Sequence, residues 1–263
     1  MKKLLFALII VLLVSCKSYD ATSKSKQVEV FDALVEPTDP EVTEVWEPKP
    51  KVVTVDRKTK IPSDAIVLFD GTGFDEWISS KDSSEVKWIL NADRSMTVKD
   101  KSGDIQTKRN FGDIQLHIEW KSPKDIRGNG QHRGNSGVFL QNRYEVQVLD
   151  NNDNETYVNG QVGAIYKQAV PLAKASSKTG EWNSYDIIYR APVFNEAGNK
   201  IKSATITVMH NGVLIQDHVE IKGTTEFIGW PKNNPHGKAP IKLQDHRDNS
   251  GVSYRNIWVR ELN

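Results

Sequence analysis

The feature that most constrains the fold of this 263-residue chain is a period-two alternation of apolar and polar residues in its last 200 positions. The clearest example is residues 113–121, where four apolar residues alternate with polar ones: Ile114, Leu116, Ile118 and Trp120. Residues 203–210 alternate similarly and lead into Asn211-Gly212, a dipeptide that favours a type I′ hairpin turn. Because successive side chains of a strand point to opposite faces, this pattern predicts antiparallel strands with one buried face.

Many further short strands are expected, and helical periodicity is nearly absent. The strands are predicted near 65–69, 86–90, 95–98, 104–107, 136–141, 144–149, 162–166, 183–190, 213–221, 240–245 and 252–261. Only 74–77 and 169–175 have the spacing of short helical turns. So many strands in one unit predict an all-β sandwich of two antiparallel sheets, one of them bent so that its outer face is concave and can bind a ligand.

Residues 1–16 have the composition of a secretory signal that ends in a lipidation site. Two lysines precede an apolar run of eleven residues, and Leu13-Val14-Ser15-Cys16 matches a bacterial lipobox. A transmembrane helix is the alternative, but the apolar run is too short to cross ~30 Å of hydrocarbon. We therefore expect residues 1–15 to be a cleaved signal peptide and Cys16 to carry lipid. This predicts an exported lipoprotein, held by the membrane on the periplasmic face or the cell surface of the outer membrane.

Residues 16–63 are expected to form a flexible tether between the lipid and a folded domain at 64–263. Five of the 11 prolines lie in this segment, and the stretch from Glu29 to Glu47 holds seven acidic residues and no Lys or Arg. Such a segment cannot bury enough apolar surface to offset the entropy lost on ordering. The acidic run would also suit a binding partner, although a solvated tether is the simpler interpretation.

The composition argues against several function classes. With 35 basic and 34 acidic residues, the net charge of +1 gives no reason to expect nucleic-acid binding. The single cysteine cannot form an internal disulfide or a cysteine-based zinc site. The sequence contains no glycine-rich phosphate loop and no Gly-x-Ser-x-Gly elbow. No cofactor is predicted, and six histidines without a local ligand motif leave a divalent metal as an open question.

The most informative stretch for chemistry is residues 144–150, Tyr-Glu-Val-Gln-Val-Leu-Asp. On a strand, Glu145 and Gln147 share one face, and a bulge at Leu149 would return Asp150 to that face. Two carboxylates beside an amide suit glycosyl chemistry, in which one group moves a proton and another supports charge. An ordinary half-buried strand is the alternative. The stretch also echoes the E-x-D-x-x-E pattern of jelly-roll glucanases, but Gln147 and Asp150 replace its last two acids.

Other polar pairs and aromatic residues extend the candidate set. Glu119 lies two residues after His117 on the same predicted face, and Gln244 and His246 have the same spacing. A histidine near Glu145 would serve as a proton donor or base at neutral pH. Two tryptophans in loops flanked by glycine or proline, Trp182 and Trp230, have the surroundings of residues that stack on sugar rings.

A seven-residue near-repeat is also visible. His-Arg-Gly-Asn-Ser-Gly-Val at 132–138 and His-Arg-Asp-Asn-Ser-Gly-Val at 246–252 agree at six of seven positions. One interpretation is that two similar loops flank one cleft, each contributing a histidine and an arginine. The other is that two similar turns use similar residues, since Asn-Ser-Gly favours a turn before a strand.

Several blocks resemble one bacterial family. They are Leu68-Phe69-Asp70-Gly71 with Trp77, residues 134–140, 144–150, Gly163-Ala164-Ile165-Tyr166, residues 180–183, 210–213, 216–218, Leu243-Gln244-Asp245-His246 and residues 255–258. In this order they resemble the family long called domain of unknown function 1080, now often described as 3-keto-disaccharide hydrolase, over essentially all of 65–263. The resemblance implies a concanavalin-like or laminarinase-like jelly-roll sandwich with the polar blocks on its concave sheet.

Two positions depart from the pattern expected of the family. Gln141 stands where an arginine is expected, and the loop after His246 reads Arg-Asp-Asn-Ser-Gly in place of a shorter turn. Both are predicted to lie near the cleft, where they would affect the choice of substrate.

The resemblance implies cleavage of 3-keto-glycosides of monosaccharide or disaccharide size. A ketone at C3 acidifies the C2 proton, so that a base removes it, the C1 substituent leaves and water then adds. On this hypothesis Glu145 is the base, and His246 or Glu119 is the partner acid. The expected substrate-binding residues are Asn135, Gln147, Asp150, Tyr166, Trp182, Gln244 and Arg255.

Two other functions remain open at this point. One is a carbohydrate-binding lipoprotein without catalysis. The other is a direct glycoside hydrolase of the jelly-roll glucanase type, which needs two carboxylates roughly 5–9.5 Å apart across the bond.

Overall fold

The structure, a computed structural model, describes residues 38–262, and the chain divides into two compact units after Val52. In the first unit, the described residues 38–52 are all exposed and contain one 3-10 helix, η1 (Pro40–Thr43). Asp39 caps this helix by accepting a hydrogen bond from the N–H of Glu41 at 3.1 Å. The exposure of this segment fits the solvated character expected of its acidic, proline-rich sequence.

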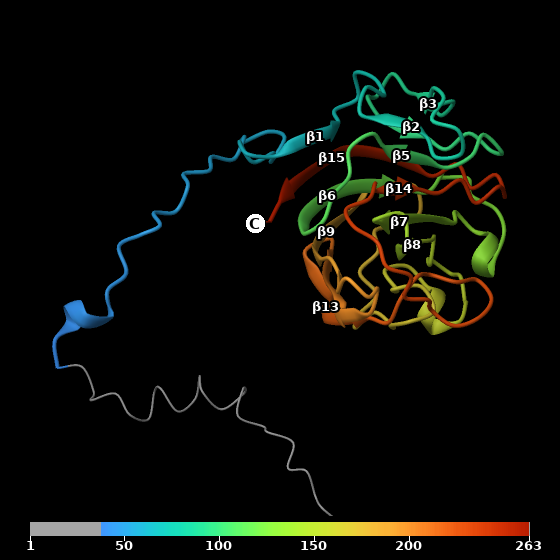
Figure 1. The fold of residues 1–263 in the computed structure, drawn as a ribbon. Helices are drawn as coiled ribbons and strands as arrows, with labels where there is room; N and C mark the ends of the chain where they lie inside the picture. The colour runs from blue at the N-terminus through green and yellow to red at the C-terminus, as the bar shows by residue number, and fades with distance from the viewer. Residues whose placement is uncertain (1–37, 263) are drawn as a thin grey trace, which may run out of the picture. The chain divides into compact units, whose positions relative to one another are not determined.

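The second unit contains two packed antiparallel sheets (Figure 1). The larger sheet has the order β13-β12-β9-β6-β15-β4-β3, and β1 pairs with β15 at one end of that strand. Its strands are β1 (Ile66–Phe69), β3 (Ile89–Leu90), β4 (Met96–Thr97), β6 (Ile114–Lys121), β9 (Asn183–Arg190), β12 (Ala204–His210), β13 (Val213–Ile221) and β15 (Ser253–Glu261).

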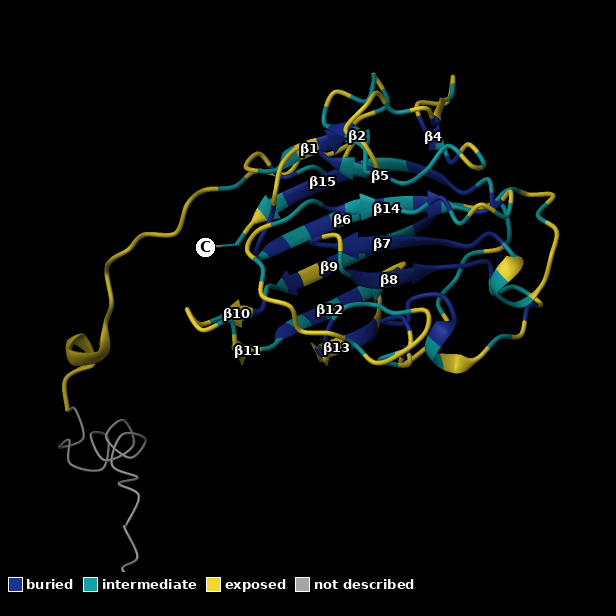
Figure 2. Ribbon diagram, turned by 45° about the vertical axis from the view of Figure 1, so that its right-hand side comes forward, coloured by how far each residue is buried: buried dark blue, intermediate teal, exposed yellow. Residues whose placement is uncertain are grey.

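The smaller sheet has five strands in the order β2-β5-β14-β7-β8. It packs face to face on the larger sheet (Figure 2). Its strands are β2 (Trp77–Ser79), β5 (Ile105–Thr107), β14 (Lys242–Leu243), β7 (Ser136–Leu140) and β8 (Tyr144–Val148). The remaining elements are the pair β10 (Val193–Phe194) and β11 (Lys200–Lys202) and the 3-10 helices η2 (Gly130–His132) and η3 (Val158–Gly160). The predicted jelly-roll sandwich of two antiparallel sheets is therefore confirmed.

The core lies between the sheets and follows the sequence alternation. Along β6 every second residue is buried, and the residues between them are only partly exposed on the outer face of the larger sheet. Val146 and Val148 of β8 are buried in the same cluster from the other side. Trp77 is 2% exposed and donates its indole N–H to the carbonyl oxygen of Leu68 at 2.8 Å, which links β2 to β1. The outer face of the smaller sheet is thus left for polar residues.

The structure contains the predicted hairpin but not every predicted strand and helical turn. Asn211 and Gly212 have φ of 51° and 79° and connect His210 directly to Val213, which confirms the type I′ hairpin. Residues 162–166 were expected to form a strand but make only isolated bridges through Ile165. The expected helical turn at 169–175 is absent from the described chain, and 74–77 is a turn that enters β2.

The second compact unit also includes residues that the sequence analysis assigned to the tether. The second compact unit begins at Val53 rather than at residue 64, because residues 53–63 turn back on themselves and contact the larger sheet. Val55 bridges Pro62, and Asn256 of β15 donates to the carbonyl oxygen of Thr59 at 3.5 Å. The predicted lipidation site Cys16 and the signal peptide lie outside the described residues. Within those residues, none of the helices has the length and apolarity needed to span a membrane.

Gln141 lies in the core rather than near a cleft, contrary to the sequence expectation. Its side chain accepts a hydrogen bond from the hydroxyl of Tyr189 at 2.7 Å and donates to the carbonyl oxygen of Phe111 at 3.0 Å and of Gly237 at 3.3 Å. Since Tyr189 is on β9 and Gln141 follows β7, the amide joins the two sheets. The departure from the family pattern at this position therefore concerns packing.

We expect Tyr189→Phe to lower the free energy of unfolding by about 1–3 kcal/mol, because it leaves the buried carbonyl oxygen of Gln141 without a donor. The measurement is urea denaturation followed by circular dichroism. Ile188→Val on the same strand is the matched control, since Ile188 is 48% exposed and should change stability by less than about 0.5 kcal/mol. Equal stability of the two variants would show that the cross-sheet hydrogen bond contributes nothing.

Candidate active site

A pocket of about 230 Å³ lies on the outer face of the smaller sheet. It is lined by Asn135, Phe139, Glu145, Gln147, Tyr166, Thr225, Phe227, Gln244 and His246. Six of these nine were selected from the sequence as candidate site residues. The pocket therefore brings together most of the polar blocks that are far apart along the chain.

Strand pairing explains how Glu145 reaches this pocket. In the β7–β8 pair Gly137 lies opposite Gln147 and Phe139 lies opposite Glu145, so these four residues share one face. A Cβ atom on Gly137 would lie 2.3 Å from Oε1 of Glu145. The carboxyl group of Glu145 thus occupies the space that a side chain at position 137 would fill.

The carboxyl group of Glu145 is buried without a direct partner. Its side chain is almost inaccessible, and among the described residues none donates a hydrogen bond to it. Burial raises the pKa of Glu145 to about 8, an effect that the ammonium of Lys242 opposes and the carboxylate of Asp104 reinforces. Lys242 itself pairs with Asp104 at 3.1 Å and lies 4.0 Å from the ring centroid of Phe139. A carboxyl group held in this way can exchange a proton near neutral pH.

A network of amides forms the wall beside Glu145. Gln147 donates through Nε2 to the side-chain oxygen of Gln131 at 3.0 Å, and Asn135 donates to the backbone carbonyl of Gln131 at 2.8 Å. The side-chain oxygens of Gln147 and Gln244 are buried and accept no hydrogen bond from the described residues. A buried acceptor without a donor costs about 1–3 kcal/mol. Since both residues line the pocket, a ligand could remove this cost by donating hydrogen bonds from its hydroxyl groups to the two oxygens.

Aromatic residues form the opposite wall and continue into a second hollow. The hydroxyl groups of Tyr157 and Tyr166 lie 2.5 Å apart. Tyr166 lines both the pocket and an adjoining hollow of about 410 Å³, which also contains Tyr157 and Trp230. Trp230 is 88% exposed, which leaves its ring accessible to a ligand; that it stacks on a sugar stays a prediction.

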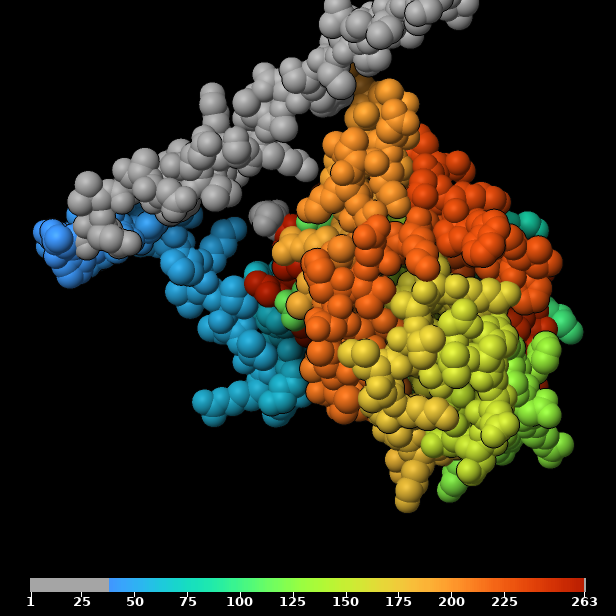
Figure 3. All heavy atoms as spheres, turned by 90° about the horizontal axis from the view of Figure 1, so that it is seen from below, coloured from blue at the N-terminus to red at the C-terminus, as the bar shows by residue number. Residues whose placement is uncertain are grey.

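The loops that carry these aromatic residues contact one another. Gln168 donates to the carbonyl oxygen of Gly223 at 2.9 Å, and the ammonium of Lys167 donates to the carbonyl oxygen of Phe227 at 2.5 Å. Figure 3 shows this surface from below, where the yellow segment after residue 150 and the orange segment after residue 200 adjoin. The second hollow is therefore built by two loops that lie outside the sheets.

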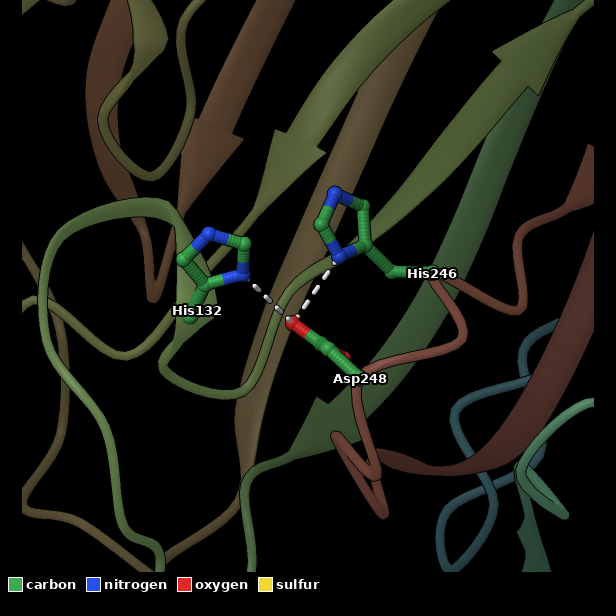
Figure 4. A group of neighbouring side chains, drawn as sticks. All are labelled: His132, His246 and Asp248. Atoms are coloured by element: carbon green, nitrogen blue, oxygen red, sulfur yellow. Dashed lines mark hydrogen bonds and ion pairs between the residues drawn. The ribbon is translucent and has the colours of Figure 1, made fainter.

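The near-repeat brings two histidines to the edge of the pocket. The rings of His132 and His246 have their centroids 6.1 Å apart, and Nδ1 of His246 lies 2.8 Å from Oδ2 of Asp248 (Figure 4). The arginines do not follow the histidines. Arg133 is directed toward Asp150, with 3.6 Å between Nε and Oδ1, and Arg247 lines a different hollow. The two loops of the near-repeat thus meet at their histidines, of which His246 lines the pocket and His132 does not.

Glu119, Arg255 and Trp182 lie outside the pocket, contrary to their predicted roles. Glu119 is on the outer face of the larger sheet, where its Oε2 lies 2.5 Å from Nε of Arg255, and the guanidinium of Arg255 covers the ring of Trp182 at 4.1 Å. Both sheets separate this cluster from Glu145, because β6 and β8 bury their other faces in the core between them.

The ionisation of Glu119 also differs from that of an acid catalyst. Partial burial would raise the pKa of Glu119, but hydrogen bonds from His117, Asn256 and Arg255 outweigh this effect and hold the pKa at about 2. Glu119 is therefore a charged, ion-paired carboxylate at neutral pH and has no proton to donate.

Asp150 is buried but does not line the pocket. Its Oδ2 accepts a hydrogen bond from the hydroxyl of Ser122 at 2.7 Å, and its Oδ1 accepts from the backbone N–H of Asn152 at 3.0 Å. Its carboxylate thus holds together the loops before β7 and after β8. Asp150 therefore supports the strand pair from outside the lining of this pocket.

Three pocket residues were missed by the sequence analysis: Phe139, Thr225 and Phe227. Phe139 could have been found, because the short connection between β7 and β8 places it opposite Glu145. Thr225 accepts a hydrogen bond from the backbone N–H of Glu145 at 3.0 Å, but its loop carries no period or motif that places it there.

Comparisons with known proteins agree with this architecture. A crystal structure of "a putative glycosyl hydrolase" from Parabacteroides distasonis is 54% identical, covers 85% of this chain and 97% of its own, and gives a TM-score of 0.81. A second structure described in the same words from the same organism is 19% identical, covers 80% of this chain and 99% of its own with a TM-score of 0.59, and shows the common fold. Among curated proteins no match was found.

The family comparison accounts for nearly all of the sandwich. The model of the 3-keto-alpha-glucoside-1,2-lyase-like domain matches residues 64–260, which include every strand of both sheets except the last residue of β15. Since this match extends over most of the chain and includes the whole pocket, the chain belongs to the 3-keto-alpha-glucoside-1,2-lyase-like domain family.

Proposed function

We propose that this protein cleaves 3-keto-glycosides by elimination across C1 and C2, followed by hydration. The observation that carries the proposal is the single buried carboxyl group of Glu145, whose pKa of about 8 suits a base that removes a carbon-bound proton. Membership of the 3-keto-alpha-glucoside-1,2-lyase-like family supports this choice of substrate.

The reaction follows from the acidity of the C2 proton beside a C3 ketone. Glu145 takes this proton, the C2–H electrons form the C1–C2 double bond, and the C1–O bond breaks with its electrons on the leaving oxygen. That oxygen takes a proton to become an alcohol, and an enone conjugated with the C3 ketone remains. Water then adds across the double bond, with its oxygen at C1 and a proton at C2, so the net change is hydrolysis.

The other pocket residues supply hydrogen bonds for this sequence. The unpaired oxygens of Gln147 and Gln244 would accept hydrogen bonds from sugar hydroxyl groups. Asn135 lines the same pocket. His246 is oriented by the hydrogen bond between its Nδ1 and Asp248, which directs its Nε2 away from that carboxylate and makes His246 the proposed proton donor to the leaving oxygen.

The carboxylates argue against direct hydrolysis of ordinary glycosides. That reaction needs two carboxyl groups facing each other across the bond. Of the described residues that line the pocket, Glu145 alone carries a carboxyl group, since Asp150 is tied to the loops and Glu119 lies on the other sheet. An elimination that begins at an activated C–H bond needs only one carboxylate base.

The adjoining hollow provides a place for the leaving group. It shares Tyr166 with the pocket and continues along Tyr157 and Trp230, whose rings suit the apolar face of a second sugar or of an aromatic aglycone. We therefore propose that the keto sugar binds against Glu145 and the leaving group against the aromatic residues.

The proposed cellular setting follows from the N-terminal sequence. We propose that Cys16 is lipidated and anchors an exported protein to the membrane, with the acidic segment before Val53 as the spacer. In that setting the pocket would receive small glycosides outside the cytoplasm.

The central test is a paired assay of a disaccharide and its 3-keto form in heavy water. We expect cleavage of the keto form only, with deuterium at C2 of the product. Glu145→Gln should lower kcat by about 10²–10⁴-fold, the usual contribution of a general base. Glu119→Gln, the matched carboxylate on the opposite face, should remain within about threefold of the unchanged protein.

Other outcomes of this assay would contradict the proposal. Cleavage of the keto form without deuterium at C2 would rule out elimination. Sugar binding without turnover of either form would favour a carbohydrate-binding protein. Cleavage of the unoxidised disaccharide would favour direct hydrolysis.

The pH profile should report the ionisation of Glu145. Because the base acts as a carboxylate, kcat/KM should fall about tenfold for each pH unit below about 8 and level off above it. A profile already level at pH 6 would show that Glu145 is not the base.

The same pKa predicts an effect on stability that is independent of activity. The pKa of Glu145 is about 8 in the folded protein, against the ordinary value of 4.5 for a glutamate. Its protonated form therefore favours folding, and this contribution is lost as pH rises from about 4.5 to 8. Glu145→Gln should therefore become progressively more stable than the unchanged protein over that range. Thermal unfolding at pH 5 and pH 8 measures the difference.

Gly137 should act as a positioning residue for the proposed base. Gly137→Ala places a Cβ atom 2.3 Å from Oε1 of Glu145 and 2.7 Å from Cε2 of Phe139, so the carboxyl group must move. We expect kcat/KM to fall by about tenfold or more and the midpoint of the pH profile to shift. Gly237→Ala is the control, because an added Cβ there meets no atom within 4 Å. An unchanged pH profile in Gly137→Ala would contradict this role.

A further inference from the structure

We propose that a polar hollow at the β2–β5 edge of the smaller sheet binds a tetrahedral oxyanion, namely a sulfate or phosphate that is either free or esterified to a saccharide. The hollow has a volume of about 320 Å³ and shares no lining residue with the pocket that contains Glu145. It lies by the edge where β2 and β5 pair (Figure 1). Its lining is formed by Ser79, Ser80, Lys81, Asp82, Ser84, Glu85, Val86, Lys87, Lys101, Ser102, Gly103, Asp104, Ile105 and Arg247.

The basic side chains of the lining are mostly free to bind an anion. Lys81, Lys87 and Arg247 are exposed and form no ion pair with another described residue. The fourth basic residue, Lys101, is paired with Asp100, with 3.5 Å between Nζ and Oδ2. Lysine and arginine are the residues that bind sulfate and phosphate groups, and the planar guanidinium can donate two parallel hydrogen bonds to one such group.

The acidic side chains of the lining are largely engaged with the protein. Oδ2 of Asp104 lies 3.1 Å from Nζ of Lys242, and Oδ1 of Asp82 accepts a hydrogen bond from the hydroxyl of Ser84 at 2.6 Å. Glu85 is the third acid, and it is exposed. Since Lys101 and Asp104 are paired with neighbours, three basic side chains face two acidic ones, and the hollow keeps an excess of positive charge.

A buried hydroxyl group adds a donor to this set. The Oγ atom of Ser102 is buried and has no hydrogen-bond partner among the described residues. The unpaired oxygens of Gln147 and Gln244 can only accept a hydrogen bond, whereas a serine hydroxyl can donate one, as an oxyanion requires. An oxyanion oxygen would therefore complete the hydrogen bonding of Ser102.

Backbone hydrogen bonds hold the three loops around the hollow. Asp245 is 5% exposed, and its two carboxylate oxygens accept from the N–H of Gly103 at 2.9 Å and from the N–H of Arg247 at 3.0 Å. The N–H of Ser80 donates to the carbonyl oxygen of Asp104 at 2.9 Å. Because the loops are already fixed to one another, a ligand would bind here without the cost of ordering them.

The hollow also accounts for the second arginine of the near-repeat. Arg247 has a φ of 60°, in the left-handed region that residues other than glycine adopt infrequently. The hydrogen bond from its N–H to Asp245 supports this conformation. As a result, His246 lines the pocket while the next residue, Arg247, lines the hollow.

The volume of the hollow is sufficient for a sugar that carries the anion. It exceeds the volume of about 230 Å³ of the pocket in which we place the keto sugar. Asp104 lines the hollow and pairs with Lys242, whose ammonium lies 4.0 Å from the ring centroid of Phe139 in the pocket lining. One ion pair thus separates the two spaces, so a saccharide ester in the hollow would be a neighbour of the pocket.

The test measures anion binding without any keto sugar, so its result is independent of the proposed function. The full chain is titrated by calorimetry with sulfate, phosphate, glucose 6-sulfate, glucose 6-phosphate and glucose, and sodium chloride keeps the ionic strength constant. We expect one saturable site for the anions and much weaker binding of glucose. Equal affinity for ester and inorganic anion would identify a free oxyanion as the ligand, and tighter binding of an ester would identify an acidic saccharide.

Two variants locate the binding in the hollow. Arg247→Gln should weaken binding by about tenfold, because it removes a charged donor, and Ser102→Ala by about threefold, because it removes a neutral one. Arg127→Gln is the matched control, since Arg127 is exposed, lies outside the lining and forms no ion pair with a described residue. Circular dichroism checks that each variant is folded.

Three results would overturn the proposal. The first is the absence of saturable binding of all four anions. The second is binding of glucose as tight as that of its esters. The third is an affinity for the anions that stays the same in Arg247→Gln, Ser102→Ala and the unchanged chain.

Discussion

The site depends on the register of three neighbouring strands. In β14, β7 and β8 the residues Lys242, Phe139 and Glu145 lie opposite one another, and their neighbours Leu243, Val138 and Val146 point into the core. A shift of one residue in either pair would exchange the two faces and bury the polar side chains between the sheets. The apolar residues of the core thus fix which carboxyl group faces the pocket.

Two glutamates of this protein show how environment determines the use of one side chain. Glu145 is enclosed, none of the described residues donates a hydrogen bond to its carboxyl group, and burial raises its pKa to about 8. Glu119 is held by a histidine, an asparagine and an arginine, which keep its pKa at about 2 despite partial burial. The first can take up and release a proton near neutral pH, whereas the second stabilises the outer face of the larger sheet as a permanent charge. Their alternating strand contexts look alike in the sequence, so only their surroundings separate the two roles.

The sequence predicted the sandwich well because burial of one strand face leaves a direct pattern of alternation. It also predicted the hairpin at Asn211-Gly212, where turn geometry restricts the residues allowed. It did not predict β10 and β11, which are short and mostly exposed, or the packing of residues 53–63 on the domain. Such segments bury little apolar surface and leave no period behind.

The sequence identified most of the strand residues that line the pocket. It did not show which of the two sheets an outward-facing residue belongs to, or which loop residues reach the pocket. Glu145 and Gln147 were found because they alternate with core residues, and Gln244 because it is two residues before His246 in a block that resembles the family. Glu119 and Arg255 were wrongly placed with them, since alternation shows that a residue faces outward but not which sheet it faces outward from. Thr225 and Phe227 reach the pocket on a loop whose path is set by contacts with another loop.

Hydrogen-bond satisfaction separates structural from functional polar residues within a single sheet. Gln141 and Gln147 lie at the two ends of the β7–β8 pair and are equally buried, yet every polar atom of the Gln141 side chain has a partner. The oxygens of Gln147 and Gln244 have none among the described residues, and neither does one oxygen of Asp248. Other buried polar atoms without a partner, such as the indole N–H of Trp120, lie away from the pocket, so the position of an unpaired atom matters as well as its lack of a partner. Because these three oxygens occur in and beside one pocket, they indicate a site built for polar ligands, whereas Gln141 serves only to join the sheets.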